Sequence, residues 1–194
     1  MSPIDGYELM EQAHAYLRAA VRGVPADGWD RPTPCTEWTV RQVLNHARLD
    51  QQALVMQIAD VAPSGDPFAP VDEVGPDPVG ELEQVLDVAT AAWESVGRDA
   101  EEVVTPIGTV ASRLGTALAA LDAAVHAWDI ARATGQELPL SDELAAGLQE
   151  PVTQFVDFVR DNYQKYAPVV VVPEQAGAAA RLLAFTGRDP EWKP

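Results

Sequence analysis

Positive charges are scarce in this sequence, and cysteine occurs once. Thirteen Lys and Arg residues stand against thirty Asp and Glu residues, so the formal net charge is −17 at pH 7. Such a chain repels phosphate backbones and anionic lipid surfaces, and no basic patch offsets the repulsion, which argues against nucleic-acid binding and membrane binding. The single Cys35 cannot form an internal disulfide, which fits a reducing compartment.

Long apolar runs are also absent. No run approaches the roughly 20 residues of a membrane-spanning helix, and the start MSPIDGYELMEQAHAYL lacks the basic region and apolar segment of a signal peptide. We therefore expect a soluble, cytoplasmic protein. The chain of 194 residues, 47% of them hydrophobic, suffices for one domain spanning residues 1–194. Its alanine-rich amphipathic stretches predict a mostly helical fold.

Helix-capping residues and breakers divide the chain into predicted helices. Asp5, Thr39 and Ser141 are N-cap candidates, and Gln42 completes a capping box with Thr39. We expect helices over residues 5–23, 39–60, 79–96 and 173–186, a central helix that ends at Gly135, and one that begins at Ser141. Pro151 should kink this last helix or divide it in two.

Two connections are expected to be irregular or extended. Residues 62–78 carry five prolines and two glycines, which predicts a long crossover that lets neighbouring helices run parallel. Residues 101–111 and 169–172 are rich in β-branched residues and predict extended chain.

The central helix carries a carboxylate and an imidazole on one face. Asp122 and His126 stand four residues apart at the margin of an apolar stripe, so both side chains point toward the bundle interior. Such a pair offers two donors to a divalent transition metal, which needs a third donor from elsewhere. His46 borders the apolar face of the second helix and is the candidate, although a histidine there is more often a hydrogen-bonded core residue. His14 falls off its apolar stripe and is expected to be solvated.

Two acidic residues could orient these histidines. Asp129 lies three residues beyond His126, and Asp50 lies four beyond His46, so either could bond the imidazole nitrogen that faces away from the metal. For Asp129 we favour instead an ion pair with Arg132, three residues further on. For Asp50 the alternative is a salt bridge on the helix surface or between helices.

His46, Asp122 and His126 are called the trio below. Other polar and aromatic residues near the trio allow weaker predictions. Arg41 and Arg48 flank His46 and could bind an anionic thiol cofactor, although isolated arginines on a helix are usually solvated. Cys35 precedes a helix, where the pKa of a thiol can be lowered, but a small packed residue is the simpler interpretation. Core positions, or positions in a pocket wall, are expected for three tryptophans: Trp38, Trp93 and Trp128.

Three stretches together resemble a known family. TPCTEWTVRQVLNHA at 33–47, LDAAVHAWDIARATGQ at 121–136 and RLLAFTGRDPEW at 181–192 resemble the actinobacterial metal-binding branch of the DinB-like superfamily, which includes mycothiol-dependent maleylpyruvate isomerase. The resemblance implies an all-α four-helix bundle with a long crossover, extra C-terminal helices and a divalent metal at one end. The family's metal histidines fall on His46 and His126, and its acidic ligand, commonly Glu, falls on Asp122. The C-terminal domain of the isomerases, with its substrate-binding arginine, has no counterpart here, so maleylpyruvate isomerisation itself is not expected.

Two imidazoles and one carboxylate leave a coordination position for water or substrate. An ion there would lower the pKa of a bound water or thiol; zinc and nickel suit these donors best, and iron and manganese also accept them. Our first hypothesis is a transferase or isomerase that depends on a metal and a mycothiol-type thiol and acts on a small electrophilic molecule, with homodimers as the resemblance implies. The alternative is a non-catalytic metal-binding protein of stress response or partner interaction. A third is a structural bundle without metal.

Overall fold

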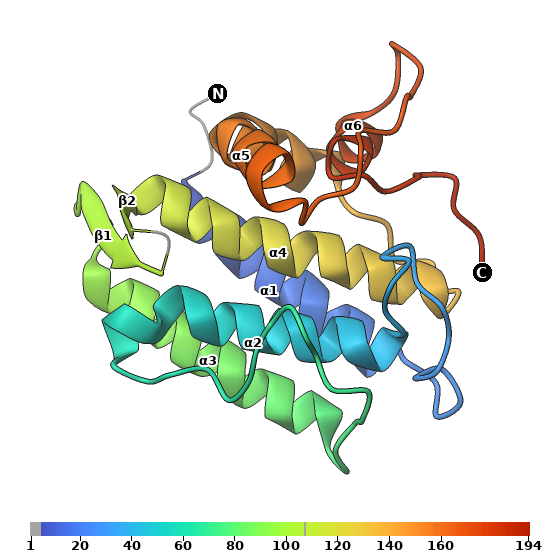
Figure 1. The fold of residues 1–194 in the computed structure, drawn as a ribbon, viewed down its shortest axis with the longest axis horizontal. Helices are drawn as coiled ribbons and strands as arrows, with labels where there is room; N and C mark the ends of the chain where they lie inside the picture. The colour runs from blue at the N-terminus through green and yellow to red at the C-terminus, as the bar shows by residue number, and fades with distance from the viewer. Residues whose placement is uncertain (1–4, 107) are drawn as a thin grey trace.

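Helices dominate the computed structural model, which describes residues 5–106 and 108–194 (Figure 1). Within this part of the chain the elements are α1 (Gly6–Arg22), α2 (Val40–Ala59), α3 (Pro78–Val96), β1 (Glu102–Thr105), β2 (Gly108–Ala111), α4 (Ser112–Ala133), α5 (Asp142–Tyr163) and α6 (Ala178–Phe185). The predicted all-α, DinB-like four-helix bundle with a crossover and extra C-terminal helices is confirmed. No helix among these residues is long and apolar enough to cross a membrane.

Helices α1 to α4 form the bundle, and the crossover sets their directions. Gly6 lies against Thr116 and Gly23 against Gln136, so α1 and α4 run parallel. The crossover between α2 and α3 passes back along the bundle, and as predicted these two helices also run in one direction, opposite to α1 and α4 (Figure 1). Residues of α2 and α4 therefore meet in antiparallel order, which brings the start of α2 beside the end of α4.

Helix α4 is the centre of the molecule, because it is buried on almost every side. A helix that is apolar all round must have neighbours all round, and α1, α2 and α5 each pack against it. Its many alanines and Gly115, which lies under the ring of Trp93, allow this close approach. Polar side chains on α4 are thereby held at fixed positions inside the protein.

The predicted helix starts are confirmed at Asp5 and Ser141, whose side chains accept from the backbone N–H groups of Glu8 and Leu144, and at Thr39 with its capping box. The last helix begins at Ala178, five residues later than residue 173.

Pro151 does not divide α5, so that part of its prediction is wrong. The buried residues of α5 keep helical spacing on both sides of it: Leu144, Ala145, Leu148, Val152 and Val156. Packing of this continuous stripe against the core outweighs the hydrogen bond that proline removes.

Residues 101–111 form more than an extended connection. Strands β1 and β2 pair antiparallel, with Val103 opposite Val110, and the hairpin leads directly into α4. Residue 107 lies outside the described residues. Residues 169–172 belong to no helix or strand.

Candidate metal centre

The structure brings the three predicted ligands together. His46 projects from α2, and Asp122 and His126 project from α4. Asp122 Oδ1 lies 3.3 Å from His46 Nε2 and 3.5 Å from His126 Nε2. One donor atom from each residue lies within 4.8 Å of the other two. The antiparallel crossing of α2 and α4 therefore converts one local pair and one distant histidine into a compact group of three donors.

A carbonyl oxygen of the crossover orients His46. His46 Nδ1 lies 2.7 Å from Pro67 O, and because a carbonyl only accepts, Nδ1 carries the proton. The lone pair of Nε2 then faces Asp122. Asp50 does not bond Nδ1 of His46, since Pro67 occupies that position; Asp50 instead lines the cavity beside the trio.

A buried ion pair orients His126. His126 Nδ1 donates to Asp129 Oδ2 at 3.0 Å, and Arg188 Nη2 donates to the same oxygen at 3.0 Å. Arg188 Nε approaches the other carboxylate oxygen at 3.4 Å, so the pair is bidentate. The favoured pairing of Asp129 with Arg132 is wrong, because Asp129 is fully buried and Arg132 donates to Trp192 O. As with His46, Nε2 of His126 is left free for a metal.

Sequence reasoning missed Arg188. It lies 59 residues after Asp129, in the TGRDPEW stretch that follows α6. That stretch carried part of the family resemblance, but no local spacing connects its arginine to α4. Only the packing of the C-terminal segment places the guanidinium beside the carboxylate.

A chain of buried hydrogen bonds orients Asp122. Gln51 Nε2 donates to Ala119 O at 2.9 Å and approaches Asp122 Oδ2 at 3.4 Å. The oxygen of Gln51 therefore faces His14, whose Nε2 donates to it at 3.0 Å. Since Gln51 holds Oδ2, Oδ1 of Asp122 is the oxygen that faces both histidines.

The prediction that His14 is solvated is wrong. It is 1% exposed, because its side chain points from α1 toward α2 and α3, with Thr90 Oγ1 3.4 Å from its Nδ1. Burial lowers its pKa to about 4, so the ring is neutral near pH 7. Hydrogen bonds with Gln51 and Thr90 satisfy the ring nitrogens of His14, so the ring can be buried although it lies off the apolar stripe.

Burial and charge act against each other at the trio. Burial lowers the pKa of His46, but the hydrogen bond and charge of Asp122 outweigh it, and the pKa is raised. Burial raises the pKa of Asp122, but the two histidines outweigh it, and the pKa is lowered. Burial keeps the pKa of His126 below its usual value. Burial and the charge of Asp122 raise the pKa of Asp50 to about 7. A bound divalent cation would oppose this last shift, because it favours carboxylate over carboxylic acid.

The donor set fits a divalent transition metal. Two imidazole nitrogens, each with a lone pair when its ring is neutral, and one carboxylate oxygen converge, and each candidate ligand is oriented by a separate hydrogen bond. Trp38 covers one side, with its ring 4.5 Å from that of His46. The three candidate ligands line a cavity of about 1550 Å³, and Trp38 forms part of its wall. The identity of the metal stays a prediction.

Cys35 and Trp38, two residues named in the sequence analysis, line this cavity. Burial raises the pKa of the Cys35 thiol to about 12, so it is protonated, in keeping with a packed small residue. Trp38 is half-buried in the cavity wall, whereas Trp93 and Trp128 belong to the core.

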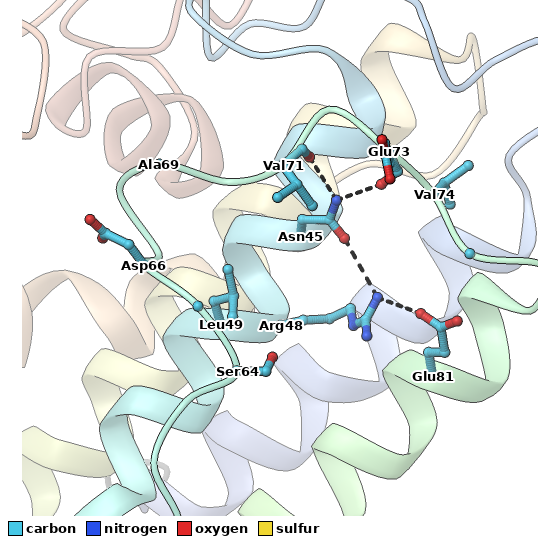
Figure 2. Close-up of a pocket in the computed structure, with 12 residues that line it drawn as sticks. Asn45, Arg48, Leu49, Ser64, Asp66, Ala69, Val71, Glu73, Val74 and Glu81 are labelled. Atoms are coloured by element: carbon cyan, nitrogen blue, oxygen red, sulfur yellow. Dashed lines mark hydrogen bonds and ion pairs between the residues drawn. The ribbon is translucent and has the colours of Figure 1, made fainter.

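The structure does not bring Arg41 and Arg48 into this cavity. Arg41 pairs with Asp30 and lies 3.7 Å from Asp72 Oδ1. Arg48 lies in a second cavity of about 350 Å³ under the crossover, where it donates to Glu81 at 2.7 Å (Figure 2). Binding of an anionic thiol by these arginines stays a prediction, and acidic residues already occupy both. The arginines in the large cavity are Arg160 and Arg188.

Comparison with known proteins shows the family and the fold of the chain. Residues 10–150 match the family described as the mycothiol maleylpyruvate isomerase N-terminal domain. An uncharacterized protein of Mycobacterium tuberculosis, found in two strains, is 30% identical over 189 residues, which is 97% of this chain and 98% of the relative. Two crystal structures of mycothiol-dependent maleylpyruvate isomerase, the first a histidine-to-alanine mutant, align with TM-scores of 0.59 and 0.55 at 17% identity, over 76% of this chain and 68% of theirs. At this identity the likeness shows a shared fold.

Proposed function

Because the chain belongs to the family of the mycothiol maleylpyruvate isomerase N-terminal domain, we propose that it is a transferase or isomerase dependent on a divalent metal and a low-molecular-weight thiol of the mycothiol type. Its substrate is a small electrophilic molecule. The observation that carries the proposal is the convergence of Asp122 Oδ1 with Nε2 of His46 and of His126 in the wall of a large cavity.

The three ligands support metal chemistry through their hydrogen bonds. Pro67 O and Asp129 hold the protons on Nδ1 of the two histidines, which leaves both Nε2 lone pairs for the ion. A bound divalent ion lowers the pKa of a thiol that coordinates it, so that more thiolate is present near neutral pH. In a transfer the thiol gives up its proton, its sulfur bonds to the electrophilic carbon, and the leaving group departs with its electron pair.

The size of the cavity supports a reaction of two molecules. Cavities for single small ligands measure about 300–1,000 Å³, and this one is about 1550 Å³. A thiol and an electrophile therefore both have room beside the trio, where proximity lowers the entropic cost of their reaction.

Elemental analysis of protein purified without chelators tests the metal site first. We expect close to one divalent ion per chain in the wild type and in the surface control Glu11→Ala, and none in the Asp122→Ala, His126→Ala double variant. The metal-loaded protein should then conjugate a mycothiol-type thiol to an epoxide or a chloroarene, and His46→Ala should abolish this activity. Equal and negligible metal in all three proteins after incubation with zinc and nickel would refute the proposal. Metal binding without any thiol-dependent reaction would favour a non-catalytic metal-binding protein.

A further inference from the structure

One wall of the large cavity is apolar along much of α4. The side chains of Leu114, Leu118, Leu121 and Val125 line it at three- and four-residue spacing. At 1.5 Å rise per residue, this stripe is about 16 Å long. It begins beside the β1–β2 hairpin, which precedes α4, and ends at the metal trio.

Neighbouring helices extend this apolar character. Helix α2 contributes Leu54, and α5 contributes Phe155, Phe158 and Val159. Val110 of the hairpin lines the end that lies away from the trio. The space between α2, α4 and α5 thus has a long apolar wall that ends at the trio, and polar side chains such as Gln154 and Lys165 line other parts of it.

Exposed aromatic side chains gather at this cavity. Among the described residues, the aromatic members of the exposed large hydrophobic side chains are Phe68, Phe158 and Tyr163, and all three line the cavity. The rings of Phe158 and Tyr163 form an edge-to-face pair 5.8 Å apart, and Lys165 Nζ lies 4.4 Å from the ring centroid of Phe68. Exposed apolar groups that border a cavity are a feature of ligand-binding sites.

We propose that the electrophilic substrate is a neutral, elongated apolar molecule, with its reactive group at the metal trio and its apolar body along α4. This inference rests on the proposed function and names the class of substrate. An anionic substrate is disfavoured, because a chain of net charge −17 repels anions, and because Asp157 and Asp129 already pair with the two arginines of the cavity. A charge of either sign on the body of the substrate is disfavoured by the apolar wall of α4, since an unpaired charge is costly to bury.

A long-chain terminal epoxide has the required chemistry. The sulfur of the thiol bonds to a ring carbon, the C–O bond breaks with its electron pair on oxygen, and that oxygen takes up the proton that the thiol released. The product is a hydroxyalkyl thioether, and the reaction needs no further reactant.

The apolar wall makes a quantitative prediction for a series of 1,2-epoxyalkanes. Burying one methylene group favours binding by roughly fourfold. The kcat/KM with metal and thiol present should therefore rise roughly fourfold per added methylene until the chain fills the cavity. The unreactive n-alkan-1-ols, measured by calorimetry, should show the same rise in affinity.

Two matched variants locate the effect. Phe158 and Val88 are 54% and 52% exposed, so arginine is tolerated by the fold at either position, but only Phe158 lines the cavity. Phe158→Arg should flatten the dependence on chain length, and Val88→Arg should leave it as in the wild type. Size-exclusion chromatography of all three proteins determines whether a second copy of the chain covers the same aromatic residues.

The outcomes separate this inference from the proposed function. Thiol conjugation that is independent of chain length would overturn the inference and leave the proposed function intact. Loss of metal binding with alkanol affinities that still rise with length would refute the proposed function and support the apolar ligand class. Equal chain-length dependence in Phe158→Arg and Val88→Arg would overturn the inference, as would a wild-type dimer that Phe158→Arg dissociates and that binds no alkanol.

Discussion

Replacing Arg188 with leucine tests whether the C-terminal segment supports the metal centre. Asp129 is 0% exposed and Arg188 is 8% exposed, so the variant leaves a carboxylate buried without its guanidinium. Removing one partner of a buried ion pair costs about 3–5 kcal/mol, against a total stability of about 5–15 kcal/mol for a typical domain. We expect the free energy of unfolding to fall by about this amount at neutral pH.

The dependence of this loss on pH identifies its cause. Burial raises the pKa of Asp129, but the charge of Arg188 and the hydrogen bond from His126 outweigh it, and the pKa lies below its usual value. In the wild type this carboxylate therefore adds stability above its unfolded pKa of 3.8, and the addition is lost as pH falls through the folded value. Without Arg188 burial dominates, and protonation relieves the penalty. The difference between the two proteins should be largest at neutral pH and should shrink in acid.

Urea unfolding of the metal-free proteins measures this difference. The midpoint should shift at an unchanged dependence on urea concentration. Arg181→Leu, which removes an exposed arginine of α6, is the matched control and should stay within about 0.5 kcal/mol of the wild type. If Arg188→Leu does not fold, Arg188→Lys keeps the charge without the bidentate geometry and should lose less stability. A stability of Arg188→Leu within about 0.5 kcal/mol of the wild type at neutral pH would refute the reasoning.

Two further predictions concern the hydrogen bonds behind Asp122. The pKa of His14 is about 4 in the fold, against an ordinary value of 6.5. As pH falls through this window the unfolded chain takes up the proton first, which lowers the free energy of unfolding by about 3 kcal/mol. Between pH 7 and pH 4 the His14→Gln variant should therefore lose less stability than the wild type, and equal losses would contradict this prediction. Gln51→Met removes the donors to Ala119 O and Asp122, so competition with a chromophoric chelator should show a metal affinity about tenfold weaker. Tyr7→Phe, which removes a distant hydrogen bond of α1, is the control and should bind metal as the wild type does. An unchanged metal affinity in Gln51→Met would count against a role of Gln51 in orienting Asp122.

The two histidines of the candidate metal centre are supported by different parts of the chain. The crossover orients His46 through Pro67, and the C-terminal segment orients His126 through Arg188 and Asp129. Arg188 lies beyond residues 10–150, which match the family. The part of the chain outside that match therefore has a structural role at the candidate metal centre as well as in covering the bundle.

The sequence by itself determined the helices and all three candidate ligands. Cap residues such as Thr39 act on backbone groups within one turn, and Asp122 and His126 share a face because the helical period is 3.6 residues. His46 was found because an apolar stripe reports which side of a helix faces the core. These are local regularities, and they are visible in any single sequence.

Only the tertiary structure decided which distant groups complete the site. His14 is buried because Gln51 of another helix accepts its hydrogen bond. Asp129 of α4 pairs with Arg188 and not with the nearby Arg132, because the C-terminal segment packs against α4 and buries both members of that pair. Neither partnership has a spacing that could be read from the chain. Burial makes an unpaired polar group costly, but which partner satisfies it depends on how the helices pack.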